Sequence, residues 1–248
     1  MVVLLAVALL GAACGDDGTD AGATGSLNVF AAASLTEAFT ELGQAFEADH
    51  PGVKVTFNFA ASSALAQQIN DGGPADVFVS ADEANMAKVT GADNASDPKI
   101  IARNRLSIIV EKGNPEAIGG LADLAKPGIV LVMCAPEVPC GKFAAAALQK
   151  AGVPATPASL EENVKAVVSK VTLGEADAGI VYETDVQAAG DEAQGVDIDI
   201  ADDPALEAVY PMAVTTKVEN REAARAWIDF VLSEAGQQTL AMYGFLTP

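Results

Sequence analysis

The chain contains little histidine, few aromatic residues and few basic residues. Of its 248 residues one is His, 5% are aromatic, and 14 Lys and Arg stand against 34 Asp and Glu, for a formal charge of −20. Such an acidic chain without basic runs repels nucleic acid and anionic membrane surfaces, so neither is an expected partner. The single histidine, His50, precedes Pro51 at the end of an expected helix, which indicates a surface turn.

Motifs of catalysis are also missing from the sequence. It shows no nucleophile–base motif and no phosphate-binding Gly-Lys-Thr/Ser signature. Asp76 and Asp82 form an acidic pair, but their strand-and-turn setting favours capping of the next helix over metal binding. We therefore expect a protein that is no enzyme, has no cofactor and offers no direct ligands to a metal cation.

The longest apolar run near the N-terminus, residues 2–13, is too short to span a bilayer and suits the core of a signal peptide. Small residues before Cys14 resemble a bacterial lipobox, although Gly11 stands where Leu is usual and no Lys or Arg precedes the run. We expect residues 1–14 to be a signal peptide with Cys14 as the lipid anchor. Residues 15–25, polar and rich in Gly, are expected to form a flexible tether.

Three cysteines are present, and a lipid on Cys14 leaves Cys134 and Cys140 as a pair in an oxidising compartment. They flank five residues that include two prolines, a loop short enough to bring the sulfurs together. The pattern favours a disulfide. Two free thiols remain an alternative, while a metal site is disfavoured because no His or further Cys lies nearby.

Strand and helix patterns alternate along the rest of the chain, which predicts an α/β fold with largely parallel sheets. Expected strands cover residues 27–30, 53–59, 75–80, 129–133, 178–182, 196–200 and 208–214. A further pair of strands within residues 100–110 is a natural crossover between two lobes. Expected helices cover residues 34–49, 62–70, 82–89 and 220–243, and others begin near 141, 161 and 183.

Two of the strand–helix junctions carry serine. Ser34 and Ser62 each follow an apolar strand and small residues, where the unpaired N–H groups and partial positive charge of a helix N-terminus favour an anion. Ser34 with Glu37 also fits a capping box, so a plain helix cap is the alternative.

Six segments in order resemble the periplasmic molybdate-binding protein of the molybdate ABC transporter. The resemblance runs from residue 27 to the C-terminus. The segments are VFAAASLT at 29–36, FAASS at 59–63, PADVFVSAD at 74–82, PEVPCG at 136–141, GIVY at 179–182 and YGF at 243–245.

This resemblance implies a type II periplasmic-binding-protein fold, with the ligand cleft between two lobes of mixed, mostly parallel sheets. Lobe 1 is expected to comprise residues 26–104 and 213–248, and lobe 2 residues 105–212. The protein would be an extracytoplasmic, lipid-anchored monomer that binds molybdate or tungstate as the oxyanion and delivers it to a membrane permease and ATPase.

The resemblance also implies the ligand-binding residues. The expected donors are Ser34 and Ser62 in lobe 1, and Cys140, Val164 and Tyr182 in lobe 2. Cys140 replaces the usual Ala and would act through its main-chain N–H, while Val164 and Tyr182 have core positions as alternatives. Neutral donors favour a fully deprotonated oxyanion over phosphate, and size would exclude sulfate.

Three other interpretations remain open. A binding protein of the same fold could take sulfate, or it could take an organic carboxylate with Arg103 or Arg105 as its partner. A cytoplasmic sensing domain of this fold is disfavoured by the signal-like N-terminus and the missing DNA-binding helices.

Overall fold

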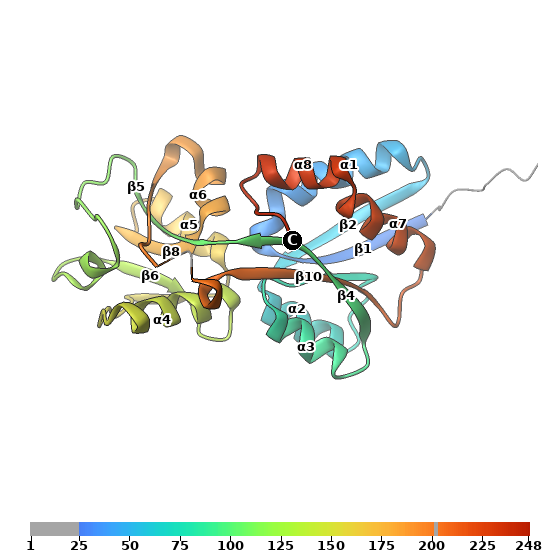
Figure 1. Ribbon diagram of the computed structural model, residues 1–248, viewed down its shortest axis with the longest axis horizontal. Helices are drawn as coiled ribbons and strands as arrows, with labels where there is room; N and C mark the ends of the chain where they lie inside the picture. The colour runs from blue at the N-terminus through green and yellow to red at the C-terminus, as the bar shows by residue number, and fades with distance from the viewer. Residues whose placement is uncertain (1–24, 201–202) are drawn as a thin grey trace, which may run out of the picture.

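The computed structural model describes residues 25–200 and 203–248. The predicted signal peptide, the predicted lipid anchor Cys14 and nearly all of the predicted tether lie outside these residues. The chain forms two lobes, each built on a five-stranded mixed sheet with helices on both faces (Figure 1). The predicted α/β class is confirmed, but the sheets are not mostly parallel as predicted, since two of the four strand pairs in each sheet are antiparallel.

The first sheet has the strand order β2-β1-β3-β10-β4. Strands β2 and β3 both run parallel to β1, whereas β10 runs antiparallel to β3 and β4. Its strands are β1 (Gly25–Ala32), β2 (Val53–Ala60), β3 (Val77–Val79), β4 (Ala95–Asn104) and β10 (Ala208–Thr215).

The second sheet has the order β7-β6-β8-β5-β9, with β6 parallel to β7 and β8 and with β5 antiparallel to β8 and β9. In both sheets the strands of strand–helix units pair in parallel, whereas pairs made by the lobe-connecting strands β5 and β10 are antiparallel. Its strands are β5 (Leu106–Glu111), β6 (Leu131–Cys134), β7 (Ser159–Glu161), β8 (Ala178–Tyr182) and β9 (Ala193–Val196).

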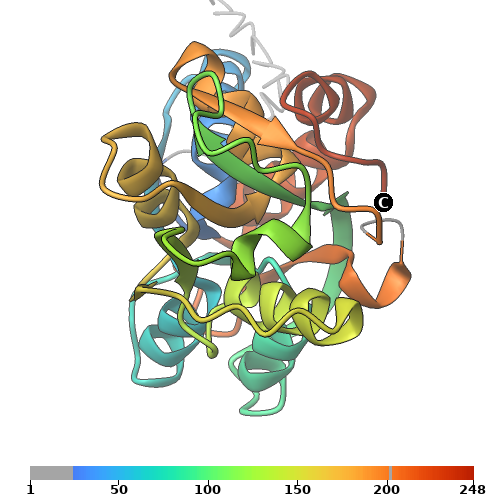
Figure 2. The same ribbon diagram turned by 90° about the vertical axis from the view of Figure 1, so that its left-hand side faces the viewer.

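Helices cover both faces of each sheet because the central strands are apolar on both sides. In the first lobe α1 (Thr36–Asp49), α7 (Arg221–Leu232) and α8 (Glu234–Met242) pack on one face around Trp227, and α2 (Ser62–Asn70) and α3 (Glu83–Thr90) pack on the other around Phe30. In the second lobe α4 (Pro139–Ala151) lies opposite α5 (Val164–Thr172) and α6 (Glu183–Ala189) (Figure 2). Short 3-10 turns are η1 (Ala33–Leu35), η2 (Leu121–Ala125), η3 (Gly190–Glu192) and η4 (Pro204–Leu206).

The chain crosses between the lobes where β4 leads through Arg105 into β5, and it returns before β10. The C-terminal segment belongs to the first lobe, because Leu246 pairs with Arg103 of β4. The predicted lobe boundary after Met212 falls inside β10, which pairs with the first sheet from Ala208 onward. Among the described residues, no helix combines the length and apolar character needed to cross a bilayer.

Three predicted elements differ from the structure. The helix expected near Glu161 begins at Val164, because residues 159–161 pair with β6 as a strand. The single helix expected over residues 220–243 is two helices, since the Ser233 hydroxyl accepts a hydrogen bond from the Gly236 N–H and starts α8. The strand expected at 196–200 ends at Val196, although Ile198 is buried and so keeps the alternating pattern of a strand.

Candidate functional site

A small cavity lies where the two lobes meet. Its volume is about 20 Å³, which suits a small ion or a water molecule and is far below the several hundred Å³ of an organic ligand pocket. All five predicted ligand-binding residues line it. The lining residues are Ala32, Ala33, Ser34, Ala60, Ala61, Ser62 and Ala81 from the first lobe, and Val138, Pro139, Cys140, Asn163, Val164 and Tyr182 from the second.

The first lobe contributes two serines from neighbouring strand–helix junctions. β1 and β2 are parallel partners, so their carboxyl ends lie at the same edge of the sheet and bring Ser34 and Ser62 to one place. Both side chains are buried. Ser34 is not the predicted helix cap, since it lies inside η1 and α1 begins two residues later, at Thr36.

The hydroxyl of Ser34 is oriented by a chain of hydrogen bonds from the crossover. The Asn104 Oδ1 atom accepts from the Arg105 N–H, so the Asn104 amide nitrogen donates to Thr184 Oγ1 at 2.8 Å and to Tyr210 Oη at 3.3 Å. The hydroxyls of Tyr210 and Ser34 share a hydrogen bond at 2.8 Å, in which either oxygen can be the donor. When Tyr210 is the donor of this bond, the proton of Ser34 is left for the cavity.

Ser62 is arranged in the same way by a shorter route. Its Oγ atom accepts a hydrogen bond from the Ala81 N–H at 2.9 Å, which leaves the Ser62 proton for the cavity. Ala81 directly precedes Asp82, the predicted cap of α3, and Asp82 Oδ1 does accept from the Asn85 N–H. Asp76 has a different role from the predicted cap, because it binds the N–H groups of Asn28 and Glu219.

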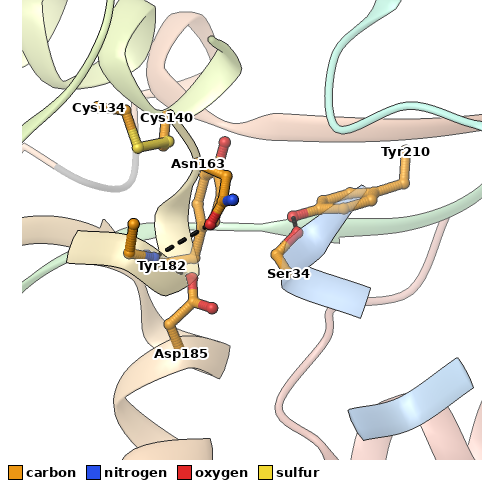
Figure 3. Close-up of a disulfide and its surroundings, with 8 residues drawn as sticks. Ser34, Cys134, Cys140, Asn163, Tyr182, Asp185 and Tyr210 are labelled. Atoms are coloured by element: carbon orange, nitrogen blue, oxygen red, sulfur yellow. Dashed lines mark hydrogen bonds between the residues drawn. A yellow bond between two sulfur atoms is a disulfide. The ribbon is translucent and has the colours of Figure 1, made fainter. Parts of the chain in front are cut away.

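From the second lobe, α4 presents its N-terminus to the cavity at Cys140. Cys140 forms the predicted disulfide with Cys134, with Cα atoms 5.8 Å apart (Figure 3). The bond ties the first turn of α4 to the end of β6. Because Cys140 sits in this first turn, its main-chain N–H has no partner within the helix and is free to serve an anion.

Helix α5 begins at Val164, and Asn163 is its cap. Asn163 Oδ1 accepts from the Ala166 N–H at 3.0 Å, which satisfies the third residue of the helix and leaves the main-chain N–H of Val164 without a helical partner. The side chain of Val164 is buried in the core. The two roles considered for Val164 are therefore compatible. Its side chain packs in the core, and its main-chain N–H is available to a ligand.

Tyr182, at the end of β8, presents a buried hydroxyl to the cavity. Within the described part of the chain this oxygen has no hydrogen-bond partner, although the residue is 1% exposed. An unpaired buried hydroxyl costs free energy, so its position calls for a partner from a ligand. Burial above all, together with Tyr210, Asp185 and Asp82, raises the pKa of Tyr182 well above its ordinary value, so the phenol stays protonated as a donor.

Several helices point their N-termini at this cavity. In the described chain, η1, α2 and α4 receive no side-chain hydrogen bond at their caps, so their first N–H groups stay available. Together with the oriented hydroxyls these groups make a site of donors and positive dipole ends. Such a site can hold a small oxyanion without a cationic side chain, even in a protein of charge −20.

An ion pair joins the lobes beside the cavity. Lys165, the second residue of α5, places its Nζ atom 2.8 Å from Glu37 of the first lobe and 3.1 Å from Asp185 of the second. Burial opposes the charge of Lys165, but Asp185 and Glu37 outweigh it and raise the pKa of the lysine. On the other side Lys142 of α4 lies 3.5 Å from Asp82 of the first lobe.

Sequence reasoning missed two residues of this site, Asn163 and Tyr210. Asn163 has a readable signal, since Asn directly before an apolar helical pattern is a favoured cap. Tyr210 has none, because its contact with Ser34 joins residues 176 positions apart. Neither Arg103 nor Arg105 lines the cavity, and Arg103 pairs with Glu207 at 2.8 Å, which argues against an organic carboxylate. Across residues 25–200 and 203–248, no cluster of His, Cys, Asp or Glu is suited to a metal ion.

Comparison with known proteins gives one matching family, a relative of similar sequence and two solved structures of the same fold. The family described as bacterial extracellular solute-binding protein matches residues 27–246. A Mycobacterium tuberculosis (strain ATCC 25618 / H37Rv) protein named molybdate-binding protein ModA is 40% identical over 224 residues, covering 90% of this chain and 85% of its own.

Two solved structures share the fold. The periplasmic molybdate-binding protein of Azotobacter vinelandii superposes with a TM-score of 0.77 at 18% identity, covering 90% of this chain and 99% of its own. The sulfate-binding protein SubI from Mycobacterium tuberculosis H37Rv superposes with a TM-score of 0.76 at 21% identity, covering 89% and 86%. At these identities the likeness concerns the fold alone.

Proposed function

Because the chain belongs to the family of bacterial extracellular solute-binding proteins, we propose that it captures molybdate, and tungstate equally, in the cavity between its lobes. The observation that carries the proposal is that the hydrogen-bonding side chains at this cavity are available as donors. Ser62 Oγ accepts from the Ala81 N–H, Ser34 Oγ accepts in the arrangement in which Tyr210 donates, and Tyr182 Oη has no partner among the described residues. Each of these groups therefore has a proton left to donate.

A site made of donors selects its ligand by protonation state. A fully deprotonated dianion accepts at every oxygen, whereas a protonated oxygen needs an acceptor that these side chains do not offer. Molybdate and tungstate are dianions at neutral pH, while phosphate is partly protonated there. Sulfate is a dianion too, but its shorter bonds leave the donors beyond hydrogen-bonding distance in a cavity closed around a larger ion.

The donors come from both lobes, and this couples binding to closure. Ser34 and Ser62 hold the ion from the first lobe, and Tyr182 with the N–H groups of Cys140 and Val164 holds it from the second. An open molecule offers one set of donors at a time. The ion therefore stabilises the closed arrangement through the contacts that only this arrangement provides.

In the cell the protein acts outside the cytoplasm as the substrate-binding component of an ABC importer. Its partners are a membrane permease and an ATPase, and it carries out binding and delivery without catalysis or a cofactor. Lipidation at Cys14 holds the monomer at the outer face of the membrane, with the segment between Cys14 and β1 as the tether; Gly25, the last residue of the predicted tether, already belongs to β1.

Calorimetric titration of the purified protein with molybdate, tungstate, sulfate and phosphate in parallel tests the function. We expect one-to-one binding of the first two with similar dissociation constants and little heat from the others. Sulfate bound as tightly as molybdate would make the protein a general oxyanion receptor. No measurable binding of any of the four ions would overturn the proposal.

A further inference from the structure

We propose that the side-chain amide nitrogen of Asn163 donates a hydrogen bond to the bound oxyanion and contributes to its selection. The inference rests on the proposed function, since it concerns the same cavity. Asn163 lies between β7 and α5, lines the cavity, and is outside the set of donors expected from the sequence.

The orientation of the amide is fixed by the helix it caps. Its Oδ1 atom accepts a hydrogen bond from the Ala166 N–H at 3.0 Å. An amide nitrogen cannot accept from an N–H group, so only this orientation of the side chain satisfies the helix. The Nδ2 atom must then point the other way. Figure 3 shows it turned away from α5, toward the side on which Ser34 and Tyr210 lie.

This arrangement repeats what the serines show. Three lining side chains can each place an oxygen on a protein donor and keep a proton for the cavity: Ser34 with Tyr210, Ser62 with the Ala81 N–H, and Asn163 with the Ala166 N–H. Asn163 also stands directly before Val164, so its amide and the first N–H groups of α5 face the same ion. The helix cap and the ligand contact are thus two functions of one side chain.

Asparagine is the cap that suits an anion site. Asn, Asp and Ser cap helices about equally well, so the helix alone does not select among them. Asp would place a carboxylate against a dianion, and Ser would offer no second donor. Elsewhere the chain uses these caps too, with Asp82 on α3 and Ser233 on α8.

The test replaces the donor while keeping the cap, with the variants Asn163→Ser and Asn163→Asp. Matched controls are Asn220→Ser and Asn220→Asp, because the Asn220 side chain caps α7 through the Ala223 N–H and is not part of the cavity lining. For each protein we would measure molybdate and tungstate affinity by calorimetry, and the melting temperature without ligand.

We expect Asn163→Ser to weaken molybdate binding about 10-fold or more, as for a lost hydrogen bond to a charged group. Asn163→Asp should weaken it further at neutral pH and recover part of the loss as the pH falls and the carboxylate is protonated. Both variants should melt near the wild-type temperature without ligand, and the controls should bind as the wild type does.

Wild-type affinity in Asn163→Ser would overturn the inference, as would losses of affinity that merely follow a lower melting temperature in both Asn163 variants. A wild-type protein that fails to bind molybdate or tungstate would instead refute the proposed function. The two failures are therefore distinguishable in one experiment.

Discussion

Single residues decide whether the groups at this cavity donate or accept hydrogen bonds. We propose that Ser34 is the acceptor toward Tyr210, since Asn104 already donates to the Tyr210 oxygen and is held in turn by the Arg105 N–H. A hydroxyl by itself can donate or accept, so its neighbours decide which it does. The selectivity of the site therefore depends on residues that do not contact the ligand.

Replacing Tyr210 with Phe tests this control of Ser34. We expect molybdate affinity to fall about 2- to 10-fold, as for a lost neutral hydrogen bond. The ratio of phosphate affinity to molybdate affinity should rise, because Ser34 can now accept a hydrogen bond from the ligand. Parallel calorimetric titrations with both ions measure the ratio. Tyr243→Phe is the matched control, since the Tyr243 hydroxyl bonds Glu41 at 2.6 Å outside the cavity. An unchanged ratio in Tyr210→Phe would contradict the proton arrangement.

The pH dependence of binding follows from the burial of Tyr182. The phenol is lost as a donor when pH rises through its folded-state pKa, and burial raises this pKa well above the ordinary value of 10.0. Molybdate affinity should therefore stay level from about pH 7 to about pH 10, where an ordinary phenol would be half ionised. Tyr182→Phe should bind about 10-fold or more weakly at every pH in this range. An affinity that already halves near pH 9 would show that the hydroxyl is not shielded.

At the scale of elements, the cavity is a meeting point of helix N-termini placed by strands. β1 and β2 end at the same sheet edge and deliver η1 and α2, while β6 delivers α4 through a turn closed by the disulfide. A backbone N–H can bind a ligand only if its helix starts at the right residue. The start of α4 at Pro139 is therefore a functional feature as well as a structural one.

Removal of the disulfide tests whether molybdate affinity depends on a fixed position of the first turn of α4. The bridge spans a sequence separation of six residues, and a loop this short gives about 2 kcal/mol of stabilisation on the chain-entropy account. The double variant Cys134→Ala with Cys140→Ala should thus melt about 4–8 °C lower and bind molybdate several-fold more weakly. The N–H of residue 140 remains in this variant, so any loss of affinity reports its position.

Scanning calorimetry of wild-type protein with and without a reductant supplies the comparison for that variant. Reduction should reproduce the lower melting temperature in the wild type and have no effect on the double variant. Equal melting temperatures for all of these samples would mean that the bridge does not stabilise the fold.

At the scale of the whole molecule, the two lobes are joined by the crossover and, across the cavity, by ion pairs. Glu37 and Lys165 come from different lobes and meet only when these are close. Lys165 keeps Asp185 as a partner within its own lobe, so its charge remains paired when the lobes part. This arrangement favours closure without leaving a buried charge alone in the open state.

Glu37→Gln should therefore weaken the closed state while sparing each lobe. Because the Glu37 side chain is 39% exposed, solvent screens the pair, and we expect only about a 2- to 5-fold loss of molybdate affinity with an unchanged melting temperature of the ligand-free protein. Glu47→Gln makes the same change of charge at a pair with Lys54 inside the first lobe and should bind as the wild type does. Equal affinities for wild type and Glu37→Gln would show that the pair of Glu37 with Lys165 does not contribute to closure.

The amino-acid sequence by itself determined the local features of this protein. The alternation of strands and helices, the serines at two strand ends, the pairing of Cys134 with Cys140 and the start of α6 at Glu183 follow from side-chain periodicity, small residues and short loops. Such signals act within a few residues along the chain. They erred at Glu161 and Ser233, where pairing with β6 and a side-chain cap decided between alternatives that the pattern leaves equal.

Only the tertiary structure decided which partners orient the hydroxyls at the cavity and what holds the lobes together. The partners of Ser34 and Ser62 lie 176 and 19 residues away, and Lys165 reaches Glu37 over 128 residues. A hydroxyl or an ammonium group carries no information in sequence about which partner it will meet. Its orientation is fixed when the fold brings that partner within hydrogen-bonding distance, which is why the residues that line the cavity could be predicted and the partners that orient them could not.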